Sequence, residues 1–136
     1  MAKYRYTNLG SWIFLIGIAL SLVLGTYHAM SLESGENFFT SDIGGWSAWF
    51  LAIIGLIVGI LAFFGEGTIT NKEIPSFLLA VIALVVMAGV FEGYHTIIHP
   101  FIGAFLAGIS MSLAIFVAPA VIIISIKLIW LIGRDR

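Results

Sequence analysis

The sequence predicts an all-α integral membrane protein, built as a four-helix bundle, on three observations. Of its 136 residues, 61% are hydrophobic, a share above that of a soluble domain. Charged residues make up 10%, and the mean hydropathy is +1.14. Polar segments divide the chain into four long apolar stretches. The basic residues fall where a four-pass protein with cytoplasmic N- and C-termini would place them, because short cytoplasmic loops are rich in Lys and Arg. They are Lys3, Arg5, Lys72, Lys127, Arg134 and Arg136.

The first predicted helix covers approximately residues 9–30, a length of about 20 residues that spans the hydrocarbon of a bilayer. The segment 31–44 is the longest polar connection and is rich in Ser, Gly and acidic residues. It also carries Phe38 and Phe39, so we expect it to dip back onto the membrane surface. By the charge bias, this connection lies outside the cell.

The remaining helices are predicted at 45–64, 75–95 and 100–132. Pro75 suits the first turn of its helix, where a missing N–H costs nothing. Pro119 lies inside the last helix and should bend it, either as a static kink or as a hinge. We therefore expect residues 1–136 to form a single multi-pass domain of the cell membrane.

Small residues recur at a spacing of four along the predicted helices. This spacing places them on one helix face and lets two backbones approach closely, which favours helix association in membranes. Such faces serve either packing within one chain or contacts between subunits, and the pattern leaves both open. The residues are Gly17, Ser21, Gly25, Gly55, Gly59, Gly89, Gly93, Ala104 and Gly108.

One polar group stands out at the predicted outer boundary. Offsets of three and four place Glu92, His95 and His99 on one helix face if the helix continues that far, and His28 ends the first helix at the same boundary. Glu-x-x-His is a spacing of metal sites in helical bundles, but the motif occurs once, and no particular metal is indicated. The alternatives are interfacial polar residues, a metal or haem site, and a proton or cation path.

The sequence indicates no enzyme. It contains no nucleophile with a base, no phosphate-binding glycine loop and no nucleic-acid patch, and the absence of cysteine excludes thiol chemistry. We predict no cofactor and no catalytic residue. The favoured function is that of a non-enzymatic, self-assembling structural or accessory subunit of a membrane complex. The expected partners are membrane lipid and either further copies of the chain or another protein of a membrane complex. The alternative is a small proton or cation channel or transporter with an acidic outer mouth.

Three parts of the chain carry a resemblance to a known group of proteins. The runs are Leu56–Gly59 with Asn71–Glu73, Phe77–Leu84, and Phe116–Ala120 followed by Lys127. Together they resemble small uncharacterised four-transmembrane-helix proteins of archaea and little-studied bacteria. The resemblance covers the second to fourth predicted helices. It implies the four-helix membrane fold and supplies no activity.

Overall fold

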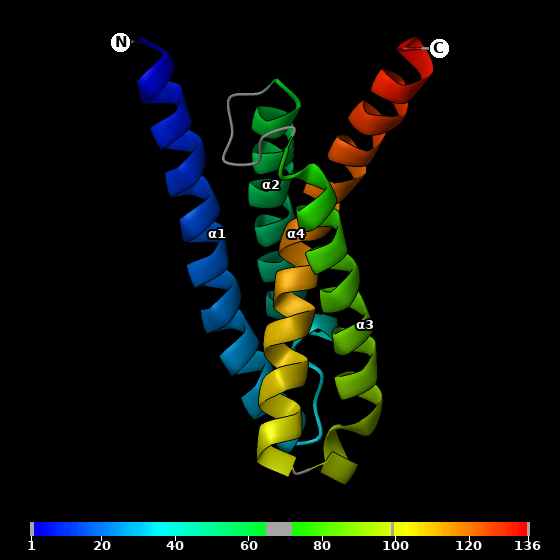
Figure 1. The fold of residues 1–136 in the computed structure, drawn as a ribbon. Coiled ribbons are helices and arrows are strands. Elements are labelled where there is room, and N and C mark those ends of the chain that lie inside the picture. Colours follow the sequence, from blue (N-terminus) through cyan, green and yellow to red (C-terminus); the bar gives the residue numbers. More distant parts are fainter. Residues whose placement is uncertain (1, 65–71, 99, 136) are drawn as a thin grey trace.

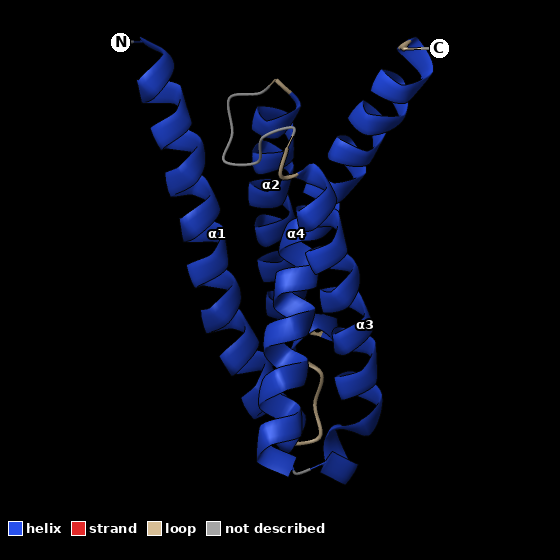
Figure 2. Ribbon diagram, viewed as in Figure 1, coloured by secondary structure: helices blue, strands red, loops and turns tan. Residues whose placement is uncertain are grey.

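The computed structural model describes residues 2–64, 72–98 and 100–135; within these ranges the side chains of 2–8, 95, 96, 98 and 100 are left out. The elements are α1 (Ala2–Glu33), the short 3-10 helix η1 (Phe38–Thr40), α2 (Asp42–Phe63), α3 (Ile74–Ile98) and α4 (Pro100–Arg134) (Figure 1). The described part of the chain has no strand (Figure 2). All four α-helices are long and apolar enough to cross a membrane. The predicted all-α class with four such helices is confirmed.

The helices are arranged around α4. Each of the other three packs on α4, whereas α1 and α3 make no backbone contact with each other in the described residues. α1 begins and α4 finishes at one end of the molecule, which we call the termini end, and η1 lies toward the opposite end, the η1 end (Figure 1). At the termini end, α1 and α4 diverge from each other (Figure 1). α4 is therefore the element through which the other helices are held together.

α1 is longer than predicted at both ends, because it runs from Ala2 to Glu33 rather than over 9–30. Gly35 explains where it stops. Its φ of 81° is a left-handed conformation that glycine adopts readily. Beyond it, the amide of Glu36 donates to the carbonyl of Ser31 at 3.0 Å, which is the closing bond of a Schellman motif.

α2 begins at Asp42, earlier than the predicted residue 45. Ser41 caps it, since its hydroxyl oxygen accepts a hydrogen bond from the amide of Gly44 at 3.1 Å. Asp42 places a negative charge in the first turn, where the helix dipole favours it. Cap and charge together move the start of the helix toward η1.

α3 and α4 also begin or end within a few residues of the predicted 75–95 and 100–132. Pro75 stands in the first turn of α3, as predicted. α4 remains helical through Pro119, and its second half is inclined to its first half (Figure 1). The proline has no N–H to donate to the carbonyl of Ile115, which accounts for a bend at this level.

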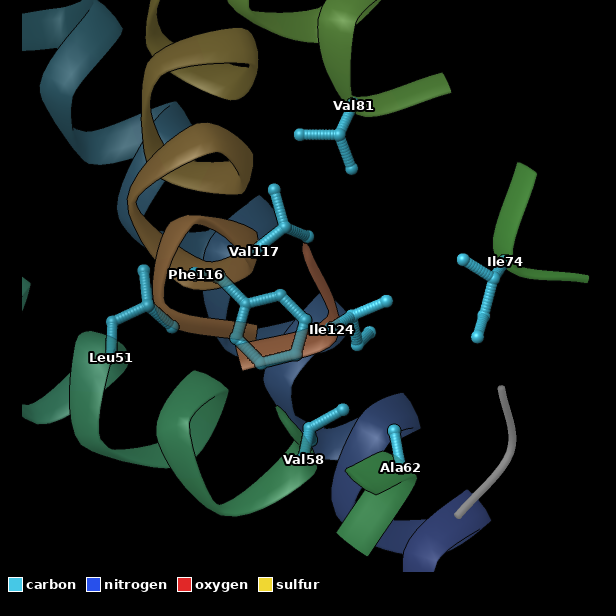
Figure 3. Close-up of a cluster of buried hydrophobic side chains, with 8 residues drawn as sticks. All are labelled: Leu51, Val58, Ala62, Ile74, Val81, Phe116, Val117 and Ile124. Atoms are coloured by element: carbon cyan, nitrogen blue, oxygen red, sulfur yellow. The ribbon is translucent and has the colours of Figure 1, made fainter. Parts of the chain in front are cut away.

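The apolar core lies where α4 meets α2 and α3 (Figure 3). Phe116 of α4 is 1% exposed, and its ring also reaches α1, where its centroid lies 5.9 Å from that of Phe14. A Cβ atom on Gly17 would lie 3.0 Å or less from this ring, so the glycine makes room for it. The buried cluster consists of Leu51, Val58, Ala62, Ile74, Val81, Phe116, Val117 and Ile124.

Candidate functional sites

Around Gly25 and Gly108, the contact between α1 and α4 is made of small residues, and an interhelical hydrogen bond joins the two helices there among the described residues. A Cβ atom on Gly25 would lie 2.7 Å from the hydroxyl oxygen of Ser112, and one on Gly108 would meet the backbone of α1. The Ser112 hydroxyl donates to the carbonyl of Ser21 at 2.6 Å. Ala104 is also buried in α4. The sequence pattern anticipated these small residues except Ser112, whose only signal is a hydroxyl in an apolar helix.

The contact between α2 and α4 is tightest around the proline of α4. A Cβ atom on Gly55 would collide with the carbonyl oxygen of Phe116 and lie 3.5 Å from Cδ of Pro119. A Cβ atom on Gly59 would lie 2.7 Å from Cα of Ala120. The glycine face of α2 thus receives the backbone of α4 where the proline interrupts its hydrogen bonds.

Gly89 and Gly93 of α3 have a different environment. Both glycines are exposed, and no heavy atom of the described residues outside their own turn lies within 4 Å of the position that a Cβ atom would take on either of them. α3 packs on α4 through other residues, among them Val81 and Ala88, which are buried. The glycine pair of α3 is therefore unused by packing within the described chain.

His28 is the most buried ionisable side chain among those that the structure describes near the η1 end. It is 1% exposed, because α1 packs on α4 at this level through Gly25 and Gly108. Its Nδ1 atom has no hydrogen-bond partner in the described residues. Buried polar atoms without partners are uncommon and call for an explanation.

Phe39 covers His28. The two ring centroids are 4.6 Å apart with the planes at 37°, and the amide of Phe39 donates to the side chain of Asn37 at 3.1 Å. Phe38, next to it, packs edge-on against Tyr27 instead, at a centroid distance of 4.8 Å. The connection between α1 and α2 thus folds onto α1, an arrangement that the predicted membrane-surface position did not include.

The same Phe39 lines an open hollow of about 480 Å³ between η1 and α2. Its wall combines hydroxyl and carboxylate groups with indole rings. The lining residues are Phe39, Thr40, Ser41, Asp42, Gly45, Trp46 and Trp49. Phe39 therefore contacts the buried imidazole and also borders a space open to the surroundings.

Glu92, which the sequence analysis grouped with His28, lies on α3. Its side chain in α3 is partly buried and close enough to interact electrostatically with the His28 imidazole, and it has further interactions. The side chain of His95 and all of His99 lie outside the described residues. Within the described residues, no group of three or more His, Cys, Asp or Glu side chains is placed to hold a metal ion.

Charges separate between the two ends of the molecule. At the termini end, Lys127 donates to the carbonyl of Ala62 at 3.2 Å and lies 5.9 Å from the ring centroid of Phe63, so it caps the last turn of α2. The described bases of this end are Lys72, Lys127 and Arg134, with the acids Glu73 and Asp135. The η1 end carries Glu33, Glu36, Asp42 and Glu92.

The chain matches no protein-family model, no curated protein and no solved structure.

Proposed function

We propose that the protein is a non-enzymatic membrane subunit that assembles with a second copy of itself through α3. The observation that carries the proposal is the open space around Gly89 and Gly93. In membranes, helices associate where small residues at a spacing of four let backbones approach. The glycine pair of α2 that has this spacing, Gly55 and Gly59, is occupied by α4.

The surface around this pair suits a helix partner. Val86, Val90 and Ile97 are exposed on α3, and their offsets place them beside the two glycines on the helix surface. A second α3 helix would fill the groove above the glycines with such side chains. Packing of this kind, rather than the hydrophobic effect, drives helix association in lipid.

Assembly is tested by the mass of the protein in mild detergent and in nanodiscs. We expect an oligomer for the wild type and a monomer for Gly89→Leu/Gly93→Leu, because the leucines fill the groove. Gly45→Leu is the control, since Gly45 of α2 is also a glycine with open space around it, and it should leave the oligomer intact. A wild type that is monomeric in both media would refute the proposal.

The orientation proposed is that of a cell-membrane protein with the termini end in the cytoplasm. It is supported by the bases gathered at that end and by the rule that cytoplasmic segments are rich in Lys and Arg. The chain has no cysteine, so single cysteines are specific labels. In intact cells an impermeant thiol reagent should label Ser34→Cys and spare Lys72→Cys. If Lys72→Cys were labelled and Ser34→Cys were not, the protein would have the orientation opposite to the one proposed.

A second candidate function is the passage of protons or cations. One observation favours it, namely a buried imidazole with an unpartnered Nδ1 atom beside the carboxylate of Glu92. Ionisable groups at membrane depth commonly mark such pathways. Proteoliposomes should then dissipate a proton or cation gradient faster than empty liposomes, and Glu92→Gln should reduce the flux. Equal rates with and without protein would eliminate this function.

A further inference from the structure

We propose that His28 is a reversible proton-binding site at the η1 end, with Glu92 as its counter-charge and Phe39 as its cover. The proposal deepens the second candidate function, yet it requires only binding of a proton and no passage across the membrane. It is also independent of assembly through α3. Its tests therefore read protonation and accessibility at His28 directly.

The imidazole of His28 is unsatisfied at one of its two nitrogen atoms in the described residues. Nδ1 of His28 is buried and has no described partner, and a side chain that is 1% exposed has little access to solvent. An unpaired buried polar atom destabilises the fold, and a protein retains such an atom where it has another role. Proton uptake gives the ring a charge that a neighbouring carboxylate can stabilise.

A carboxylate on α3 provides the counter-charge to the ring. On α3, Glu92 interacts electrostatically with His28, while the side chain of His95 is outside the described residues. α4 has no ionisable residue from Phe101 to Ile126, and η1 has none. The neighbouring acids Glu33, Glu36 and Asp42 are exposed. Among the acidic side chains near His28 in the described residues, Glu92 is thus the one that is partly buried between helices and interacts electrostatically with the ring.

Phe39 borders both the imidazole and the open hollow. An aromatic ring at a centroid distance of 4.6 Å stabilises a cation better than aliphatic groups do, so it favours the imidazolium. Phe39 also lines the open hollow beside η1. Displacement of this one ring would connect the imidazole with the hollow, and this gives the proton a route from the surroundings.

The chemistry is a simple proton transfer. A hydronium ion or a protonated buffer molecule in the hollow supplies the proton, which binds the ring nitrogen that carries the lone pair. The donor leaves as water or as the conjugate base. The imidazolium then has an N–H at both nitrogens, and the carboxylate of Glu92 stabilises its positive charge electrostatically.

The decisive experiment is a histidine NMR titration of the full chain in nanodiscs. The protein has three histidines, and His28→Gln identifies the His28 signals by their loss. We expect the ¹⁵N shifts of His28 to change reversibly from the neutral to the charged form between about pH 4 and pH 9. A ring that stays neutral throughout overturns the proposal without any variant.

The role of Glu92 is tested by Glu92→Gln. Because a nearby negative charge favours the protonated imidazole, removal of the Glu92 charge should move the His28 titration midpoint to lower pH. Glu36→Gln is the control, since Glu36 is exposed in the connection, and it should leave the midpoint in place. An unmoved midpoint in Glu92→Gln overturns the assignment of the counter-charge.

The cover is tested by modification of His28 with diethyl pyrocarbonate, read by peptide mass spectrometry. Phe39→Ala should raise the modification rate several-fold, because it opens the imidazole to the hollow. Phe38→Ala is the matched control, since Phe38 packs on Tyr27, and it should leave the rate near that of the wild type. Equal rates in the two variants would overturn the role of Phe39.

Proton binding and proton transport are distinguished by comparing two measurements. If His28 titrates reversibly but proteoliposomes show no flux above that of empty liposomes, the proton-binding site stands and the transport function does not.

Discussion

α2 and α3 both carry two glycines four residues apart, and the two pairs have opposite environments. Gly55 and Gly59 lie against the backbone of α4, whereas Gly89 and Gly93 face open space. The local pattern is the same in both helices. The difference teaches that Gly-x-x-x-Gly marks a surface able to accept a backbone, and that the arrangement of the other helices decides whether the chain itself supplies that backbone.

The proline of α4 is part of this difference. Pro119 leaves a carbonyl without its helical donor, and α4 presents the same stretch of backbone to Gly55. α3 packs on α4 through side chains such as Val81 and Ala88 instead. α2 thus packs against the bent backbone of α4, whereas α3 packs against α4 through side chains. Identical substitutions in the two glycine pairs should therefore have opposite effects.

The largest effect is expected for Gly55→Ala. The added methyl group collides with the carbonyl of Phe116, and overpacking of this kind costs about 1–3 kcal/mol. Unfolding by sodium dodecyl sulfate in mixed micelles, followed by circular dichroism, measures the loss. Gly45→Ala in the same helix has no such neighbour and serves as the control. Unchanged stability of Gly55→Ala would mean that α2 and α4 lie farther apart.

A smaller effect of opposite sign is expected for Gly89→Ala and Gly93→Ala. No atom within 4 Å obstructs the new methyl groups, and replacing glycine inside a helix stabilises it by about 0.5–1 kcal/mol. The same unfolding assay, performed under conditions that keep the protein monomeric, should record this gain. A loss of stability in the monomer would show that these glycines are packed within the chain.

The smallest effect concerns the α1–α4 contact, which adds a hydrogen bond to a glycine surface. Ser112→Ala removes the bond to the carbonyl of Ser21, and interhelical hydrogen bonds in membranes contribute about 0.6 kcal/mol on average. Ser47→Ala is matched to it, because the Ser47 hydroxyl bonds only within its own helix, to Ile43. Equal losses in both variants would remove any special role of the interhelical bond.

The ends of the helices were less predictable than their existence. Hydropathy placed all four helices, but α1 and α2 continue into the polar connection. Gly35 sets the end of α1 through its left-handed backbone conformation. Ser41 sets the start of α2 through its capping hydroxyl. Read as stop and start signals, they shorten the predicted connection.

The candidate site was predicted only in part. The sequence grouped His28 with Glu92 at one boundary, since both lie near the outer ends of their predicted helices. It did not predict that His28 would be buried or that Phe39 would cover it. Burial depends on how closely α1 approaches α4, and the cover depends on how the connection folds back, and both are contacts between segments distant in sequence.

The sequence by itself determined that this chain has four apolar helices and that its charges gather at opposite ends. These properties are local, because helix length must match the bilayer and basic residues are biased by side. Only the tertiary structure decided that α4 is central. It also decided that Gly17 and Gly25 of α1 and Gly55 and Gly59 of α2 lie against α4, whereas Gly89 and Gly93 of α3 have no such neighbour among the described residues. Lipid tails and apolar side chains are nearly equivalent surroundings for a helix, so composition does not select a helix's partner, whereas the close fit of particular backbones does.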